Sequence, residues 1–330
     1  MTRRRLLFVH NTPSSWVVQD LADLREAFDV REIYFRNRLQ DAWAILMGTL
    51  WADGVFGWFA SVHSFLGVLA AKLLGRPSWV VIGGYDTAIL PEIAYGNLRS
   101  GPRRWITLLA LRGATCLLPV SRYAADEARR NAKVSPEAMR LLYHGYPPPP
   151  DGVPPKQAMV LTVGIVNESN LQRKGLLAFV EVARHVPEAT FVLMGSADPA
   201  VRDALERIAP DNLVFTGFVS DSERDQTYAR AAVYLQLSAH EAFGSSVAEA
   251  MRYGCVPVVS DRGALPEVVG EAGLVVPLGD PAAAAEAVRV ALGRIDLRER
   301  ARERIAKEFP RQARREGLVQ AVSTRLEEAG

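Results

Sequence analysis

Short apolar runs alternate with amphipathic stretches along the whole chain. Runs of this length match buried strands, and the stretches between them carry apolar residues at helical spacing. Strands that alternate with helices form a parallel sheet covered by helices on both faces. The first half of the chain therefore predicts a doubly wound α/β domain. Its strands are expected at 6–10, 30–35, 54–59, 78–84, 116–121 and 139–145, and clear helical patterns cover 17–28 and 122–132.

A proline-rich segment divides this pattern in two. Residues 147–156 read PPPPDGVPPK, and because proline lacks a backbone donor and fixes φ, neither a helix nor a central strand is expected there. The alternation restarts after this predicted linker, so we expect two Rossmann-like domains, at 1–150 and 151–310. Strands of the second domain are expected at 159–166, 190–196, 213–219, 233–238 and 255–260, and helices at 175–186, 201–209 and 222–231.

One apolar run has nearly the length of a membrane span. Residues 54–71, GVFGWFASVHSFLGVLAA, carry no Asp, Glu, Lys or Arg, and a run of this length could cross a bilayer. It also fits a short strand, VFGWFA, followed by a buried helix that ends at Gly75 before Pro77, which is ordinary punctuation for an αβ unit. We favour the strand and the helix.

The composition is that of a globular protein in a reducing compartment. Of 330 residues, 49% are hydrophobic and 23% are charged, which excludes disordered and fibrous classes, and the length favours two domains. Cys116 and Cys255 each lie among apolar residues, so neither a disulfide nor a thiolate metal site is expected. The apolar part of MTRRRLLFVH is too short for a signal peptide. We expect a cytoplasmic protein.

Positive charge is concentrated in the first half of the chain. Residues 1–150 carry 18 Lys and Arg against 12 Asp and Glu, whereas residues 151–330 carry 21 against 25. The basic half could attract phosphates or an anionic membrane face, or it could be an ordinary solvated surface. No nucleic-acid partner is expected, because no recognition motif accompanies the charge. We predict weak, salt-sensitive contact with the inner membrane face through Arg3, Arg4, Arg5, Arg36, Arg38, Arg99, Arg103 and Arg104.

Two glutamates, Glu241 and Glu249, stand eight residues apart in HEAFGSSVAEAM, between two expected strands. Glu241 then lies on a loop, and Glu249 lies on a helix whose first turn contains Gly244, Ser245 and Ser246. The unpaired N–H groups and the dipole of that turn can hold negative charge. Carboxylates are poor phosphate ligands, so we expect the glutamates to accept hydrogen bonds from sugar or ribose hydroxyls.

Two cations precede another expected helix. Arg173 and Lys174 are placed at the end of a loop after the first strand of the second domain, just before a helix that begins at Gly175. Ligands of open α/β sheets bind where strand carboxyl ends meet helix amino ends, and two cations there suit a diphosphate. A solvated pair is the alternative interpretation. The Walker A and GxGxxG nucleotide motifs are both absent.

The segment SAHEAFGSSVAEAMRYGCVPVVSDRGALPEVVG at 238–270 resembles the E-x7-E region of the retaining GT-B glycosyltransferases of family four. RKG at 173–175 and VFTGFVS at 214–220 fit the same pattern, so the resemblance covers about two-thirds of the chain. It implies an α/β architecture of two Rossmann-like domains with a cleft between them. The first domain would bind the acceptor, and a last helix at 311–328 would cross back onto it.

The resemblance also implies roles for the charged residues. Lys174 and Arg173 would hold the diphosphate of a nucleotide-sugar donor, Glu249 would bind the ribose hydroxyls, and Glu241 would face the donor sugar. The charge that develops on the leaving diphosphate would be stabilised by these cations and by helix amides, so no metal and no cofactor are expected. The donor could be a UDP-, GDP- or other NDP-sugar. The remaining residues implied to border the nucleotide are Gly164, Gly217, Phe218 and Val219.

The sequence departs from the family pattern at two points. Gly164 is followed by Ile165 where many members have an arginine close by, so Arg173 would have to substitute for it. Many members also have a sugar-facing histidine where this chain has GGYDT at 83–87. We place Asp86 of this segment in the cleft as a catalytic candidate, because the glycines let the backbone approach a ligand. A turn role fits an Asp beside Gly-Gly equally well.

The acceptor, whether a sugar, a lipid-linked molecule or a small molecule, is expected near residues 14–16 and 83–86. Ser14 and Ser15 could contact an acceptor hydroxyl or cap the following helix, and we favour capping. The predicted function is transfer of a sugar, with retention, from a nucleotide-diphosphate sugar to a hydroxyl. The alternatives are a noncatalytic glycosyltransferase-like subunit and a sugar-nucleotide epimerase.

Overall fold

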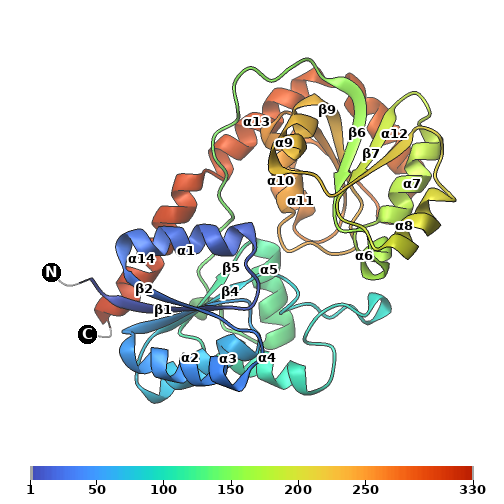
Figure 1. Cartoon of the computed structure of the whole chain (residues 1–330). Coiled ribbons are helices and arrows are strands. Elements are labelled where there is room, and N and C mark those ends of the chain that lie inside the picture. Colours follow the sequence, from blue (N-terminus) through green and yellow to red (C-terminus); the bar gives the residue numbers. More distant parts are fainter. Residues whose placement is uncertain (1–2, 329–330) are drawn as a thin grey trace. The chain divides into compact units, whose positions relative to one another are not determined.

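The computed structural model describes residues 3–328 and divides into two compact α/β units (Figure 1). The first unit comprises Met1–Gly145 and Arg311–Gly330, and the second comprises Tyr146–Pro310. The boundary therefore lies at 145, slightly before the expected 150. Residues 147–156 form neither helix nor strand.

The first unit contains a five-stranded sheet in the order β2-β1-β3-β4-β5, and every pair of neighbouring strands is parallel. The inner strands β3 and β4 are buried along their whole length, which explains why they are continuous apolar runs. The strands are β1 (Arg5–His10), β2 (Asp29–Tyr34), β3 (Gly54–Trp58), β4 (Ser78–Ile82) and β5 (Cys116–Pro119).

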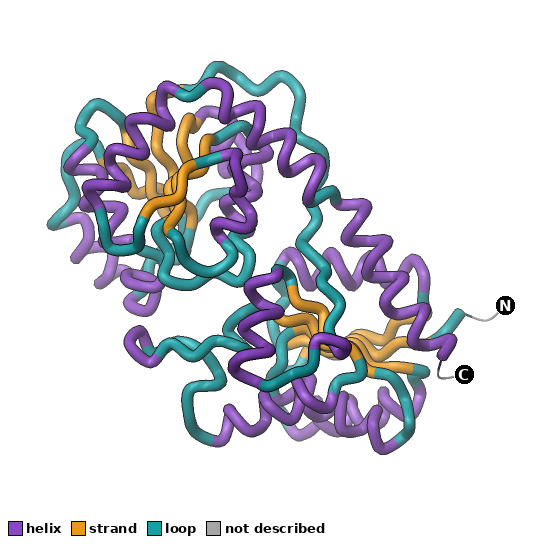
Figure 2. Tube along the Cα trace, turned by 180° about the vertical axis from the view of Figure 1, so that it is seen from behind, coloured by secondary structure: helices purple, strands orange, loops and turns teal. Residues whose placement is uncertain are grey.

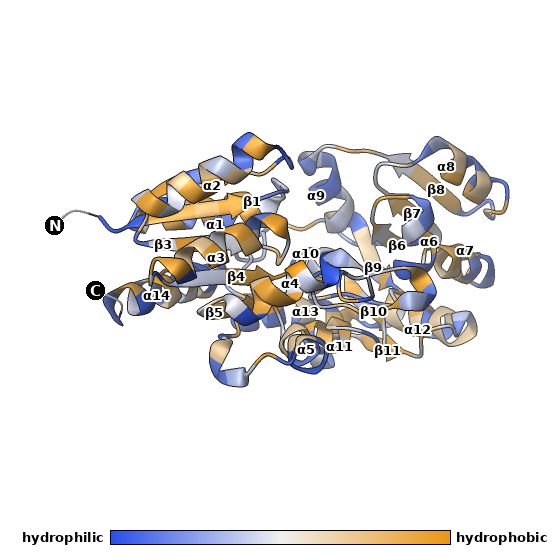
Figure 3. Ribbon diagram, turned by 90° about the horizontal axis from the view of Figure 1, so that it is seen from below, coloured by the Kyte–Doolittle hydropathy of each residue, from blue (hydrophilic) through white to orange (hydrophobic). Residues whose placement is uncertain are grey.

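Helices cover both faces of this sheet. Figures 1 and 3 show α2, α3 and α4 side by side along one face, whereas α1 and α14 pack against each other on the opposite face. A short π-helix (Ala128–Ala132) continues α5, and 3-10 turns lie at Pro91–Ile93 and Pro136–Ala138. The α-helices are α1 (Ser15–Ala27), α2 (Leu39–Trp51), α3 (Val62–Leu73), α4 (Pro102–Gly113), α5 (Arg122–Glu127) and α14 (Arg311–Glu328).

The apolar run at 54–71 forms strand β3 and helix α3, as expected. Within the part of the chain that the structure describes, no helix combines the length and the hydropathy that crossing a bilayer requires. The prediction of a strand at 139–145 is wrong. Its backbone pairs with β5 only as far as Leu142, and the carbonyls of Leu142 and Tyr143 then accept hydrogen bonds from Arg314 of α14, at 2.6 and 3.4 Å, instead of from a neighbouring strand.

Helix α14 joins the first unit through a buried ion pair. Arg314 contacts Asp20 of α1 through two hydrogen bonds, Nη2 to Oδ2 at 2.5 Å and Nε to Oδ1 at 3.0 Å. Trp58 Nε1 donates to the same carboxylate at 2.9 Å, and Trp79 Nε1 donates to the Ala321 carbonyl of α14 at 3.1 Å. The last helix therefore supplies both charge and packing to the core of the first unit.

The second unit contains a six-stranded parallel sheet in the order β11-β10-β9-β6-β7-β8. Figure 2 shows its strands enclosed by helices, and all six residues of β9 are buried. The strands are β6 (Gln157–Val163), β7 (Thr190–Met194), β8 (Leu213–Gly217), β9 (Ala231–Gln236), β10 (Val256–Ser260) and β11 (Leu274–Val276). The helices are α6 (Glu168–Arg173), α7 (Leu176–His185), α8 (Pro199–Glu206), α9 (Asp221–Arg230), α10 (Ser245–Arg252), α11 (Leu265–Val269) with a 3-10 turn (Gly270–Ala272), α12 (Pro281–Gly293) and α13 (Ile295–Glu308).

Each sheet reverses its winding direction once. In the second unit the chain runs from β6 out to β7 and β8, and then returns to the other side of β6 as β9. In the first unit it runs from β1 to β2 and returns beside β1 as β3. Open parallel sheets bind ligands at such points, outside the carboxyl ends of the two central strands. The ends of β6 and β9, and those of β1 and β3, are therefore where ligands are expected.

Candidate functional site

An ion pair lies at the carboxyl edge of the second sheet, at the ends of the neighbouring strands β6 and β9, where the sheet reverses its winding direction. Lys174 Nζ donates to Glu241 Oε1, and their side chains are only 17% and 12% exposed. Ser238 Oγ donates to the same carboxylate oxygen at 3.0 Å. Two of the residues singled out from the sequence therefore contact each other directly, although 67 positions separate them in the chain.

Two glycines allow this contact. Gly175 has φ +69°, and a Cβ there would lie 2.1 Å from the Leu237 carbonyl oxygen, so only glycine lets this segment approach the end of β9. The Arg173 carbonyl accepts a hydrogen bond from Ala239 N at 2.8 Å, which fixes that approach. On the other side a Cβ at Gly263 would lie 2.4 Å from the Glu241 carbonyl oxygen. The loop that carries Glu241 is thus held between two close backbone contacts.

The segment before Lys174 differs from the expectation. Residues 168–173 form the short helix α6 instead of a loop, because the Asn167 side chain caps it by accepting from Asn170 N at 3.0 Å. Arg173 is the last residue of α6, and its guanidinium donates to Asn170 Oδ1 through Nε at 3.1 Å and Nη2 at 2.5 Å. Its role as a diphosphate ligand stays a prediction.

A chain of hydrogen bonds between polar side chains of β9 and the loop after it ends at Glu241. Val163 N donates to Tyr234 Oη at 3.1 Å, and Tyr234 Oη donates to Gln236 Oε1 at 3.2 Å. Gln236 Nε2 then donates to Ser238 Oγ at 2.6 Å, and Ser238 donates to Glu241. These residues were missed in the sequence, although they alternate within AVYLQLS and therefore share one face of a buried strand.

The ion pair sets the protonation state of Glu241. Burial alone would raise the pKa of this carboxyl, but the Lys174 ammonium with its hydrogen bond, the Arg173 charge and the hydrogen bond from Ser238 outweigh it and hold the pKa below its usual value. Glu241 is consequently an anionic acceptor at neutral pH and not a proton donor.

Glu249 occupies a different environment on α10. Burial raises the pKa of its carboxyl, although the Arg224 guanidinium and the Tyr228 hydroxyl oppose the shift. Tyr228 Oη donates to Glu249 Oε2 at 3.2 Å, and Tyr228 is fully buried. The glutamate is thus oriented by a rigid neighbour on α9, which sequence reasoning did not identify.

The amino end of α10 lies between the two glutamates, as expected. Gly244 is its N-cap residue with φ +96°, and Ser245 and Ser246 form its first turn. Ala248 N makes the first intrahelical bond, to the Gly244 carbonyl at 3.1 Å, so the preceding amides are directed out of the helix. Such a terminus can hold a phosphate group.

The other predicted nucleotide contacts follow strands β6 and β8. Gly164 N donates to the Met194 carbonyl at 2.9 Å, and a Cβ at Gly164 would meet nothing within 4 Å, so this backbone is accessible. Gly217 has φ +70° at the end of β8, and Phe218 beyond it is 84% exposed. Val219 is partly buried. Their contact with a base stays a prediction.

The first unit has a pocket of about 520 Å³ at the point where its own sheet reverses direction. The lining comes from segments that follow β1, β2, β3 and β4, and from α4. Amides, hydroxyls and one guanidinium provide most of its polar groups. The residues are Asn11, Thr12, Asn37, Phe59, Ser61, Val62, Tyr85, Asp86, Asn97, Arg103, Ile106 and Thr107.

Asp86 lines this pocket but its carboxylate is already engaged. It accepts hydrogen bonds from Gly84 N at 2.8 Å, Ala60 N at 3.0 Å and Gly83 N at 3.4 Å, and the side chain is buried. This geometry gives Asp86 a structural role in the turn, and its catalytic role stays a prediction. Ser14 occupies the N-cap position of α1 without making the side-chain capping bond that we favoured.

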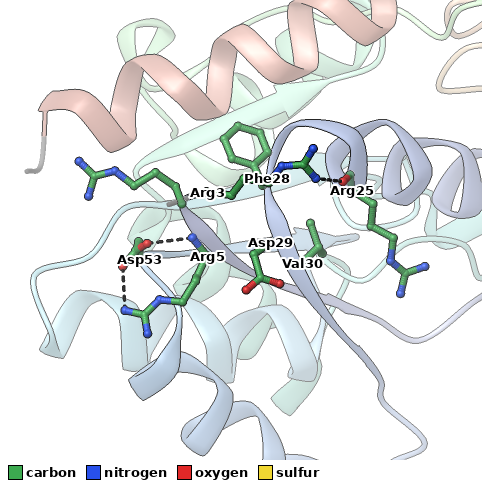
Figure 4. A pocket seen from close by; sticks show the side chains of 8 residues that line it. Arg3, Arg5, Arg25, Phe28, Asp29, Val30 and Asp53 are labelled. Carbon is green, nitrogen blue, oxygen red and sulfur yellow. Dashed lines mark hydrogen bonds and ion pairs between the residues drawn. The ribbon is translucent and has the colours of Figure 1, made fainter. Parts of the chain in front are cut away.

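A second cavity of the first unit, about 920 Å³, lies at the opposite edge of the sheet, around the amino ends of β1 and β2 (Figure 4). Arg3, Arg4, Arg5 and Arg25 line it, and Arg5 Nη2 pairs with Asp53 Oδ1 at 3.3 Å. Parallel sheets seldom carry their chemistry at this edge, so we do not assign the reaction to this cavity. Among residues 3–328, no group of three or more His, Cys, Asp or Glu side chains is arranged to hold a metal ion.

None of the residues that line the 520 Å³ pocket is a histidine, and His240, directly before Glu241, is buried in the second unit. His63 lies wholly inside the first unit, where Nε2 donates to the Trp58 carbonyl at 2.7 Å and burial lowers its pKa to about 4. His10 and His144 are also buried, and His185 lies on α7. Burial also lowers the pKa of His144.

We expect His63 to make the first unit sensitive to acid. Because its folded-state pKa lies below the usual 6.5, the unfolded chain takes up the proton first, and stability is lost as pH falls from about 6.5 to about 4. The loss should be on the order of 3 kcal/mol. All six tryptophans precede residue 146, so denaturation followed by tryptophan fluorescence reports on this unit. His63→Gln should lose less stability than wild type between pH 7 and pH 4; equal losses would contradict the assignment.

Part of the chain is similar in sequence to known glycosyltransferases. Residues 157–294 match the family model described as Glycosyl transferases group 1. A glycogen synthase of Streptococcus pneumoniae (strain Hungary19A-6) is 34% identical over 120 residues, which cover 35% of this chain and 25% of that enzyme. The chain therefore matches only about a quarter of the length of this curated relative.

Similarity to solved structures extends over the whole chain. Anabaena Alr3699/HepE in complex with UDP and glucose has a TM-score of 0.78 at 16% identity, covering 97% of this chain and 100% of that one. The chain has the GT-B fold. Sucrose-phosphate synthase from Thermosynechococcus elongatus shares this fold, with a TM-score of 0.77 at 18% identity, covering 99% of this chain and 100% of that one. Lys174, Glu241 and Glu249 all lie within the segment 157–294 that matches the family model.

Proposed function

We propose that the protein is a glycosyltransferase that moves a sugar from a nucleotide-diphosphate sugar to a hydroxyl acceptor, with retention of configuration. The main observation behind this proposal is the Lys174–Glu241 pair, which lies at the carboxyl ends of β6 and β9, beside the amino end of α10. The match of residues 157–294 to the group 1 model and the fold shared with a UDP-bound protein support this proposal.

The donor would be held by three kinds of contact. Lys174 and the first-turn amides of α10 bind the diphosphate, and Glu249, oriented by Tyr228, accepts hydrogen bonds from the ribose hydroxyls. Glu241, kept anionic by Lys174, accepts bonds from the sugar hydroxyls. Phe218 and the backbone at Gly164 and Gly217 border the base.

The chemical step would rest on electrostatic stabilisation. As the bond between the anomeric carbon and the diphosphate oxygen breaks, negative charge grows on the leaving group, and Lys174 and the α10 amides would stabilise that charge. The charge of Arg173, which already helps to lower the pKa of Glu241, would add to this stabilisation. These groups supply the stabilisation without a metal ion. We assign no enzymic nucleophile, and NMR of the product's anomeric proton would test retention.

The acceptor would bind in the 520 Å³ pocket of the first unit. Side-chain amides of Asn11, Asn37 and Asn97 can both donate to and accept from sugar hydroxyls, and Arg103 can pair with an anionic group. Ser14 precedes α1 and Ser15 is its first residue, after the segment that leaves β1.

One observation favours a second candidate, a noncatalytic glycosyltransferase-like subunit. At the position of the usual sugar-facing histidine, this chain has a carboxylate that three backbone amides occupy. Such a subunit would bind nucleotide without transferring or hydrolysing the sugar. Incubation with UDP-, GDP- and ADP-sugars, followed by quantification of released nucleotide, separates the two candidates.

Nucleoside diphosphates should stabilise the protein against heat. At about 100 times its dissociation constant, the correct diphosphate should add roughly 2.7 kcal/mol of stability. This corresponds to about 4 °C if both units melt together, or about 8 °C if the second unit melts alone. A thermal screen of UDP, GDP and ADP by circular dichroism measures the shift. If no diphosphate moves the wild-type midpoint, the donor site is wrong.

Glu249→Gln should roughly halve this shift at the same ligand concentration. Glutamine keeps a hydrogen-bond acceptor for Tyr228, but a neutral amide binds hydroxyls less strongly than a carboxylate, and we expect about tenfold weaker binding. Glu286→Gln on α12, an exposed position, is the control and should respond as wild type does. A full response from Glu249→Gln would rule out its assigned contact with the ribose.

A further inference from the structure

The outer side of α2, α3 and α4 is unusually apolar for a solvent-facing surface. Leu39 is 92% exposed and Leu73 is 79% exposed, and both lie in rows of large apolar residues at helical spacing. Figure 3 shows these helices, side by side on one face of the first sheet, largely in the apolar colour. We call this surface the α2–α4 face. It consists of Leu39, Trp43, Leu46, Met47, Leu50, Leu69, Leu73, Trp105 and Leu109.

Helix α2 shows why the α2–α4 face needs an explanation. Its inner side is already used: Ile45, Gly48 and Thr49 are buried, and a Cβ at Gly48 would come within 2.7 Å of the Leu7 side chain. The residues of the α2–α4 face lie on the other side, so α2 is apolar on both sides. A helix of this kind is normally covered on both sides.

The charges around the α2–α4 face are almost all positive. The three helices contain one acidic residue, Asp41, and its carboxylate accepts hydrogen bonds from Arg36 N at 2.7 Å and Arg38 N at 3.3 Å. Basic residues lie on the helices and on the segments just before α2 and α4. They are Arg36, Arg38, Lys72, Arg99, Arg103, Arg104 and Arg112.

The positive charge around the α2–α4 face indicates which kind of partner it binds. A second copy of the chain docked through the same face would bring two basic margins together, which is unfavourable. Anionic lipid headgroups complement the margin, while acyl chains accept the apolar residues, and tryptophans such as Trp43 and Trp105 are favoured at the boundary between headgroups and acyl chains. The helices have 12 or 13 residues, which suits lying on a bilayer better than crossing it.

We propose that the α2–α4 face docks the first unit onto an anionic lipid bilayer. Leu39, Trp43, Leu73 and Trp105 enter the headgroup region and the basic margin contacts lipid phosphates. This inference goes beyond the proposed sugar transfer and does not depend on it. Because α4 also lines the 520 Å³ pocket through Arg103, Ile106 and Thr107, docking would hold that pocket close to the lipid headgroups.

Cosedimentation with vesicles tests the proposal. The full chain should bind vesicles of phosphatidylcholine with about 30% phosphatidylglycerol at 50 mM salt, bind several-fold less at 500 mM salt, and bind poorly to phosphatidylcholine alone. Equal recovery from anionic and neutral vesicles at both salt concentrations would overturn it.

Two pairs of exposed substitutions separate the apolar and charged contributions. Trp43→Ser with Trp105→Ser should weaken partitioning into anionic vesicles at least tenfold at both salt concentrations. Arg36→Gln with Arg38→Gln, two exposed arginines that do not line the 520 Å³ pocket, should weaken it about 20-fold at 50 mM salt and much less at 500 mM, since each arginine near the surface contributes about fivefold. Ile295→Ser on α13, an exposed apolar residue of the second unit, and Arg315→Gln on α14 are matched controls that should bind as wild type does.

Two results would overturn the lipid assignment even if vesicles bind. One is unchanged binding by the double tryptophan variant, because the α2–α4 face would then not be the contact. The other is a wild-type dimer in sedimentation velocity that the tryptophan variant dissolves, which would assign the face to a second copy of the chain. Folding of each variant is checked by circular dichroism, and nucleotide stabilisation should be unchanged, so failure here is distinguishable from failure of the donor site.

Discussion

Lys174→Met is expected to reduce the rate of sugar transfer by about 10²–10³-fold, the usual effect of removing one preorganised donor from developing negative charge. In the structure Lys174 is fixed by Gly175 and by its pairing with Glu241, so it contributes its charge without further reorganisation. Methionine keeps the length and the apolar stem but removes the ammonium. Initial rates of nucleotide release from the donor sugar measure the effect.

Stability must be measured beside this rate, because the substitution leaves Glu241 buried without its cation. The double variant Lys174→Met with Glu241→Gln removes both charges and should recover most of any lost stability, yet remain inactive. Lys307→Met, at an exposed lysine of α13, is the control and should keep wild-type rates. A Lys174→Met protein that transfers sugar at wild-type rate would exclude Lys174 from the reaction.

Arg314→Met should destabilise the first unit by about 3–5 kcal/mol. The Arg314 side chain is 1% exposed, and its removal leaves Asp20 and the Leu142 carbonyl buried without their main partner. The adjacent residue is a natural control: Arg315 is 43% exposed and pairs with Glu26 at the surface, so Arg315→Met should cost less than about 1 kcal/mol.

Chemical denaturation followed by tryptophan fluorescence measures both variants, because all six tryptophans belong to the first unit. Trp58 is an internal reporter, since its indole donates to the same Asp20 carboxylate. Equal losses for the two arginine variants would contradict the role given to the buried pair.

The strand pattern was predictable because buried parallel strands are continuous apolar runs, and those runs recover β1 to β10 to within a few residues. Strand β11 has three residues, too few for a period to show. Helix α6, ESNLQR, has no apolar period and depends on the Asn167 cap. The supposed strand at 139–145 failed because Arg314, far along the chain, takes its carbonyls.

The candidate site was also predictable only in part from the sequence. Local features placed Glu241 on a loop and Glu249 on a helix, since each depends on nearby residues. The pairing of Lys174 with Glu241 could not be read locally, because it requires β6 and β9 to be neighbours in the sheet. Tyr228, which orients Glu249, lies on a helix with no distinguishing motif. Burial and contact with Glu249 reveal its role, and both are properties of the fold.

The position of α14 also determines when the protein can finish folding during its synthesis. Arg314 and Ala321 leave the ribosome only after the 165 residues of the second unit, which at roughly 5–20 residues per second is a delay of roughly 8–30 s. Until then Asp20 lacks its arginine and Trp79 lacks its acceptor. The second unit, which is continuous in sequence, can therefore fold while the first is still incomplete. The amino-terminal half of this chain is translated first and is completed last.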